Sequence, residues 1–141
     1  MKRFTLVAIC LVVIACFTST TAFAGSPHFV GTCTATLNPD GSVTFNNGKE
    51  AGLGDEAQIN ANLTVIAECI NPGSHHPKAA NKTANTFTEN IPVQNGKATY
   101  ESITVGPVVT SPSCTPPMTL AIASAAIDDT TNSLTQSCTV Q

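Results

Sequence analysis

The sequence predicts an all-β domain, specifically an antiparallel β-sandwich of immunoglobulin-like type with about seven strands and two disulfides. Three observations support this: apolar and polar residues alternate almost everywhere, turn residues separate the alternating segments, and no segment has a helical period. Trp is absent and there is a single Tyr, so the core tryptophan of immunoglobulin domains is missing. The prediction therefore concerns the architecture alone, and a β-barrel is the alternative.

The clearest strand is expected at residues 58–70. Ile59, Leu63 and Val65 fall on one face of this strand. Asn60 and Asn62 fall on the other face, as alternation with a period of two requires. We expect a long strand with one buried face.

Two hairpins and two later strands complete the expected set. Turn chemistry at Asn38-Pro39-Asp40-Gly41 predicts the first hairpin, and Asn95-Gly96, which favours a type I′ turn, predicts the second. The segments expected to be strands are 28–37, 42–46, 86–94, 97–105, 118–127 and 133–140. Four prolines make residues 106–117 a poor strand and favour an extended crossing between the sheets.

The first 24 residues have the pattern of a secretory signal peptide. Lys2 and Arg3 precede an apolar run over residues 6–16, and Ala22-Phe23-Ala24 offers small residues where a signal peptidase cleaves. We expect a signal peptide over residues 1–24 and a single secreted, extracellular domain over residues 25–141. No later run approaches the roughly 20 apolar residues of a spanning helix, so no transmembrane segment is expected.

A lipoprotein is the alternative destination. Val13-Ile14-Ala15-Cys16 resembles a bacterial lipobox, in which Cys16 would be acylated and become the first mature residue. The protein would then be exported by the same route but anchored to a membrane.

The charge of the predicted mature domain excludes one class of partner. Four lysines remain against nine acidic residues, a formal charge of −5. Binding to a phosphate backbone needs a basic surface that this composition lacks, so we expect no nucleic acid. The partner expected is another protein or a component of the cell surface.

Four cysteines remain after the leader. Cys33, Cys69, Cys114 and Cys138 are an even set in an exported domain, which predicts two disulfides, and none lies in the Cys-x-x-Cys spacing typical of zinc sites. Three connectivities are possible. We favour the nested one, Cys69 with Cys114 inside Cys33 with Cys138, because the outer bond would tie the first strand to the last.

The loop over residues 71–85 is the candidate ligand site. It is long for a compact β domain and contains His75, His76, Lys78 and Lys82. Adjacent histidines on an extended backbone point to opposite sides, so no metal is assigned to them. A metal- or anion-binding module that uses this loop is the alternative function.

Enzyme signatures are mostly absent. The sequence has neither a Gly-x-Ser-x-Gly elbow nor a His-Glu-x-x-His motif. Glu68, Glu89 and Glu101 are acids of the kind that glycoside hydrolases use, but each is expected on a solvated strand face. We expect binding or a structural role, no enzymatic activity, no catalytic residue and no cofactor, and a small secreted hydrolase is the further alternative.

Several stretches together resemble a family of small secreted bacterial proteins of unknown function. The residues that support the resemblance are Lys49-Glu50-Ala51-Gly52-Leu53-Gly54, Cys69 with Asn71-Pro72-Gly73, His76-Pro77-Lys78-Ala79-Ala80-Asn81-Lys82, Ser113-Cys114 and Asp129-Thr130-Thr131-Asn132. The resemblance implies a secreted β domain in which Cys69 and Cys114 are bonded. This chain departs from the pattern where Cys114 is followed by Thr-Pro-Pro-Met, and in its additional Cys33 and Cys138. No activity is known for the group.

Overall fold

The computed structural model describes residues 25–72 and 82–141, and these contain ten strands and no helix. The strands are β1 (His28–Phe29), β2 (Thr34–Leu37), β3 (Val43–Asn46), β4 (Gly48–Ala51), β5 (Gln58–Ile70), β6 (Lys82–Gln94), β7 (Lys97–Tyr100), β8 (Ile103–Val105), β9 (Thr119–Asp129) and β10 (Leu134–Val140). No helix that could cross a membrane occurs in these residues. The predicted signal peptide and Cys16 lie outside them.

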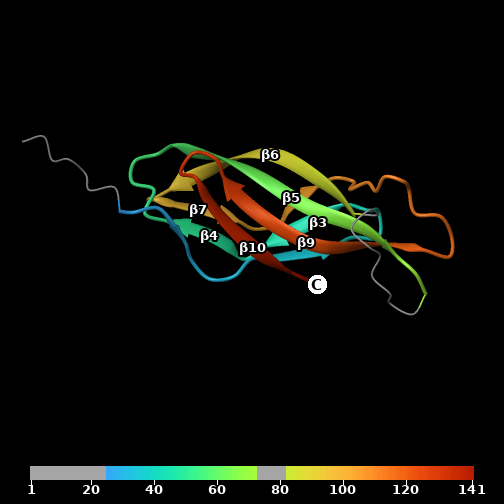
Figure 1. Ribbon diagram of the computed structural model, residues 1–141. Coiled ribbons are helices and arrows are strands. Elements are labelled where there is room, and N and C mark those ends of the chain that lie inside the picture. Colours follow the sequence, from blue (N-terminus) through green and yellow to red (C-terminus); the bar gives the residue numbers. More distant parts are fainter. Residues whose placement is uncertain (1–24, 73–81) are drawn as a thin grey trace, which may run out of the picture.

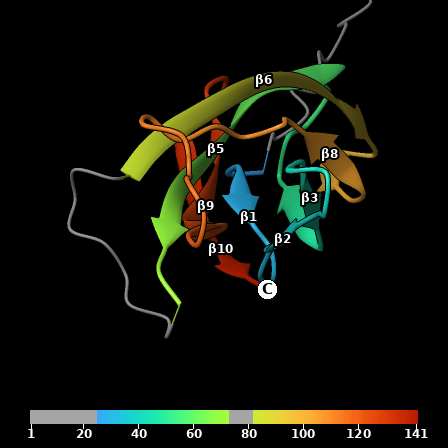
Figure 2. The same ribbon diagram turned by 90° about the vertical axis from the view of Figure 1, so that its right-hand side faces the viewer.

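All ten strands belong to one curled sheet in the order β1-β4-β7-β6-β5-β9-β10-β2-β3-β8. The two 13-residue strands, β5 and β6, form the middle of the sheet (Figure 1). The view of Figure 2 shows the other strands curling round from this middle so that they enclose an interior. Every neighbouring pair is antiparallel except β10 with β2, which is parallel.

The all-β class and the two disulfides are confirmed, whereas the seven-stranded antiparallel sandwich is not. A single mixed sheet of ten strands encloses the core, so one sheet supplies all the walls that two would supply in a sandwich. Two expected strands are each split at a residue with a left-handed backbone, Gly31 (φ 78°) and Ser102 (φ 56°). The halves then pair with different neighbours, β1 with β4 and β2 with β3.

The best-patterned segments form as predicted. Strand β5 spans Gln58–Ile70, with the expected inward and outward alternation as far as Ala67. Asn95 (φ 52°) and Gly96 (φ 69°) have the two positive φ angles of a type I′ turn between β6 and β7. No strand forms over residues 106–117; instead Asn85 of β6 donates to the carbonyl of Val109 and accepts from its N–H, at 3.0 and 2.9 Å.

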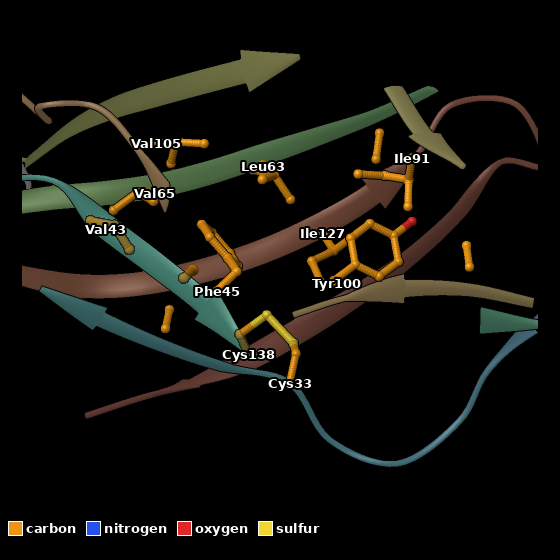
Figure 3. Packing of buried hydrophobic residues seen from close by; sticks show 14 of the residues in the cluster. Cys33, Val43, Phe45, Leu63, Val65, Ile91, Tyr100, Val105, Ile127 and Cys138 are labelled. Carbon is orange, nitrogen blue, oxygen red and sulfur yellow. A yellow bond between two sulfur atoms is a disulfide. The ribbon is translucent and has the colours of Figure 1, made fainter. Parts of the chain in front are cut away.

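The core fills the concave side of the curled sheet. Figure 3 shows Phe45, Leu63, Ile127 and Tyr100 directed into one interior space from four different strands. All four are fully buried. Burying an aliphatic side chain of this size contributes about 1.5–3 kcal/mol, so the curled sheet is held mainly by this shared interior.

Both disulfides are present and nested as predicted. Cys33 is bonded to Cys138 across 105 residues, and Cys69 is bonded to Cys114 across 45 residues. The outer bond lies beside the parallel pairing of β2 with β10, and thus joins the N-terminal part of the chain to its last strand. Two disulfides indicate an oxidising compartment.

Removing each disulfide as an alanine pair tests its contribution to stability. We expect Cys33→Ala/Cys138→Ala to lower the free energy of unfolding by about 2–4 kcal/mol, because the outer bond restricts the unfolded chain most. In the loop-entropy model the inner pair, Cys69→Ala/Cys114→Ala, costs about 0.7 kcal/mol less. Urea unfolding of both variants measures the difference, and a costlier inner pair would contradict it.

Gly48 has no room for a side chain. A Cβ at this position would lie 3.0 Å from Ile127 Cδ1, 3.0 Å from the Cβ of Tyr100 and 3.4 Å from the Cβ of Cys33. We expect Gly48→Ala to lower the free energy of unfolding by about 1–3 kcal/mol through overpacking. The control is Lys49→Ala on the outer face of the same strand, which should change stability by less than about 0.5 kcal/mol.

Candidate functional site

The predicted ligand loop lies largely outside the described residues. His75, His76 and Lys78 lie outside the described residues, so their role in ligand binding remains a prediction. Lys82 is described at the start of β6, where its Nζ lies 3.3 Å from Oε2 of Glu68. The Lys82 side chain is 37% exposed and that of Glu68 only 1%. Lys82 thus compensates a buried carboxylate.

The three glutamates considered for hydrolysis do not form a common site. Glu68, expected on a solvated face, is instead buried, and it forms an ion pair with Lys82 of the neighbouring strand β6. Glu89 lies opposite Ala61 on the half-buried inner side of β6, and Glu101 lies exposed between β7 and β8. Within residues 25–72 and 82–141, no group of three or more His, Cys, Asp or Glu side chains is arranged to hold a metal ion.

The most distinctive outer surface lies over β1, β4, β7 and β6. The strand register aligns Gln94, Lys97, Ala51 and His28 in one row across these strands. Lys49 pairs with Thr99 in the adjacent row, and its carbonyl accepts a 2.8 Å hydrogen bond from the N–H of Val30. We call this surface the lysine groove, and its lining comprises Val30, Lys49, Glu50, Ala51, Pro92, Gln94, Asn95, Lys97, Ala98 and Thr99.

Two adjoining cavities lie along the lysine groove and share Lys97 and Thr99. The cavity over β1, β4 and β7 has a volume of about 220 Å³ and a mostly apolar lining that includes Val30 and Ala51. The cavity over the β6–β7 turn has a volume of about 380 Å³ and a more polar lining that includes Asn95. The groove thus offers an apolar end and a polar end with a lysine between them.

Positive charge is concentrated in the lysine groove. Lys49 and Lys97 occupy diagonal positions on β4 and β7, a geometry that places Cβ atoms within about 8 Å of each other. Neither lysine forms an ion pair with a carboxylate in the described part of the chain, where Lys82 pairs with Glu68. Two uncompensated cations side by side on an acidic protein attract an anion.

The inner faces of β4 and β7 have the opposite chemistry. Because side chains alternate, Glu50 and Tyr100 point inward where Lys49 and Thr99 point outward, and both inward residues are fully buried. The Tyr100 hydroxyl donates to Oε2 of Glu50 at 3.3 Å. Phe29 lies opposite Glu50 on β1, so the carboxyl group stands against aromatic surface.

Asp129 at the end of β9 is also buried and interacts with Glu50. Its Oδ1 accepts hydrogen bonds from the N–H of Thr131 at 2.8 Å and from the N–H of Asn132 at 3.3 Å. Its Oδ2 accepts from Nδ2 of Asn132 at 2.8 Å. These three hydrogen bonds fix the position of the Asp129 carboxyl group, and Nδ2 of Asn132 also donates to Oε2 of Glu56 at 3.3 Å.

Glu50 is the protonated member of this pair. Burial, followed by the hydrogen bond and the negative charge of Asp129, raises the pKa of Glu50 from 4.5 to about 8. Oε1 of Glu50 has no hydrogen-bond partner among the described groups. An ionised carboxyl group would therefore leave a charged, buried oxygen without a donor, which favours the protonated form. Burial, followed by the charges of Glu50 and Asp129, likewise raises the pKa of Tyr100.

Partial signals for these buried groups are present in the sequence. The alternation of β4 was hidden because residues 46–54 contain three glycines and suggest tight turns. Asp129-Thr130-Thr131-Asn132 is a pattern in which an aspartate accepts a hydrogen bond from the backbone N–H two residues later. The two stretches meet inside the molecule, and both belong to the motifs that support the family resemblance.

Comparisons with protein-family models, with curated proteins and with solved structures found no match to this chain.

The Glu50 carboxyl group makes stability depend on pH. Because its pKa is raised on folding, its contribution is complete below about pH 4.5 and is lost as the pH rises to about 8. We expect the free energy of unfolding to fall by about 2–4 kcal/mol between pH 5 and pH 8.5. Glu50→Gln should flatten this dependence, and urea titrations at several pH values compare the two proteins. An equally steep fall in Glu50→Gln would show that another group is responsible.

Proposed function

We propose that this protein is an exported β domain that acts by binding a small ligand in the lysine groove, not by catalysis. The two disulfides and the leader pattern of residues 1–24 support export. Export as a secreted protein cleaved after Ala24 is proposed in preference to anchoring through Cys16.

The observation that supports binding most strongly is the pair of adjoining cavities at Lys97 and Thr99. Together they give a recess with apolar, cationic and hydrogen-bonding walls, the combination that orients a ligand. The recess lies on four short strand segments held from beneath by the core, so its shape is fixed before a ligand arrives. A rigid recess lowers the ordering cost of binding.

We also propose membership of the secreted bacterial family that the motifs resemble. The structure gives its Lys-Glu-Ala-Gly-Leu-Gly segment two physical roles: Lys49 lies in the groove, and Glu50 meets Asp129 in the core. Gly52 is also constrained, because its φ is +79° and a Cβ would lie 2.4 Å from the carbonyl oxygen of Ser26. The segment thus connects groove and interior.

A fragment screen followed by amide NMR tests the proposed function. We expect ligands to shift the amide signals of Lys49, Ala51, Lys97 and Thr99 and to be recovered chemically unchanged after incubation. The double variant Lys49→Gln/Lys97→Gln should bind anionic fragments at least roughly fivefold more weakly, since charge-assisted contacts contribute about 1–3 kcal/mol.

The proposal fails if the fragments shift only the signals of the cavity beside Cys114, which Val108, Val109 and Leu120 line. Conversion of a fragment to a new product would contradict the non-catalytic role.

A further inference from the structure

We propose that the ligand of the lysine groove is a small amphipathic carboxylate, with its anionic group between Lys49 and Lys97 and its apolar group against Val30 and Ala51. This inference rests on the proposed function and adds the chemical class of the ligand. It depends on how charge, shape and apolar surface are distributed along the groove.

The two lysines of the groove favour an anionic ligand. Lys97 of β7 lies opposite Ala51 of β4, and Lys49 of β4 lies opposite Thr99 of β7. Each lysine therefore faces a small side chain on the neighbouring strand. The space above Ala51 and Thr99 is therefore open to a group that both lysines reach. A carboxylate accepts charge-assisted hydrogen bonds from two donors at once, and the Thr99 hydroxyl adds a neutral donor at the same place.

The apolar end selects what is attached to the carboxylate. Val30 is 44% exposed and is one of the large apolar side chains that remain exposed in the described part of the chain. It lines the 220 Å³ cavity together with Ala51 and Ala98, and Lys49 and Lys97 border the same cavity. A short alkyl or aryl group attached to the carboxylate covers Val30 and removes this surface from water.

The size of the recess limits the ligand. Cavities of 220 and 380 Å³ are at or below the low end of the volumes typical of drug-sized ligands. The polar end near Gln94 and Asn95 accommodates an additional hydrogen-bonding group but has no cation beyond Lys97. The structure thus points to one carboxylate per ligand and not to a polyanion.

A homologous series of probes tests the class. Acetate, butanoate and hexanoate have the same charge and increasing apolar length, and amide shifts of the isotope-labelled domain 25–141 with both disulfides formed report their dissociation constants. We expect each step of two methylenes to tighten binding roughly three- to tenfold, since a fully buried methylene contributes about 0.8 kcal/mol. Hexanol, which lacks the charge, should bind at least roughly fivefold more weakly than hexanoate.

Variants connect the probes to the two lysines. Lys49→Gln and Lys97→Gln should each weaken hexanoate binding by at least roughly threefold, whereas the charge-preserving Lys97→Arg should retain it. Equal binding of acetate and hexanoate would overturn the apolar half of the inference. Binding of hexanol as tight as that of hexanoate, with shifts still in the groove, would overturn the carboxylate and leave the proposed function intact.

Discussion

The parallel pairing of β2 with β10, joined covalently by Cys33 and Cys138, is the contact on which the rest of the structure depends. Two hydrogen bonds continue it, from the N–H of Thr139 to the carbonyl of Cys33 at 2.9 Å and from the N–H of Gln141 to the carbonyl of Ala35 at 3.0 Å. All other strand pairs are antiparallel, and this one joins segments about 100 residues apart. It connects β3 and β8 to the rest of the sheet and so completes the enclosure of the core.

The enclosure gives β4 and β7 two chemically opposite faces. Their inward side chains meet β9 across the core, where buried Asp129 raises the pKa of buried Glu50. Their outward side chains form the lysine groove. The raised pKa keeps Glu50, which lies beneath the groove, mainly protonated at neutral pH, and this leaves the field of Lys49 and Lys97 available to an anion.

The sequence predicts those features that local chemistry decides. Alternation located β5 at residues 58–70, Asn95-Gly96 located a type I′ turn, and the cysteine positions favoured the nested disulfides. The curl of the sheet and its parallel pair were not predictable, because a period of two shows which residues share a face but not which strands become neighbours. Burial of Glu50 was hidden for the same reason, since a glutamate next to Lys49 in a glycine-rich segment resembles a solvated turn.

Disulfide mapping of the natively exported protein by mass spectrometry, with alkylation before and after reduction, tests the covalent link beside the β2–β10 pair most directly. The account predicts a chain that begins at Gly25, no alkylation before reduction, and a linked peptide that contains Cys33 and Cys138. Cys33 or Cys138 alkylated without reduction, or either one linked to Cys69 or Cys114, would contradict the account. An acylated chain that begins at Cys16 would replace secretion with membrane anchoring.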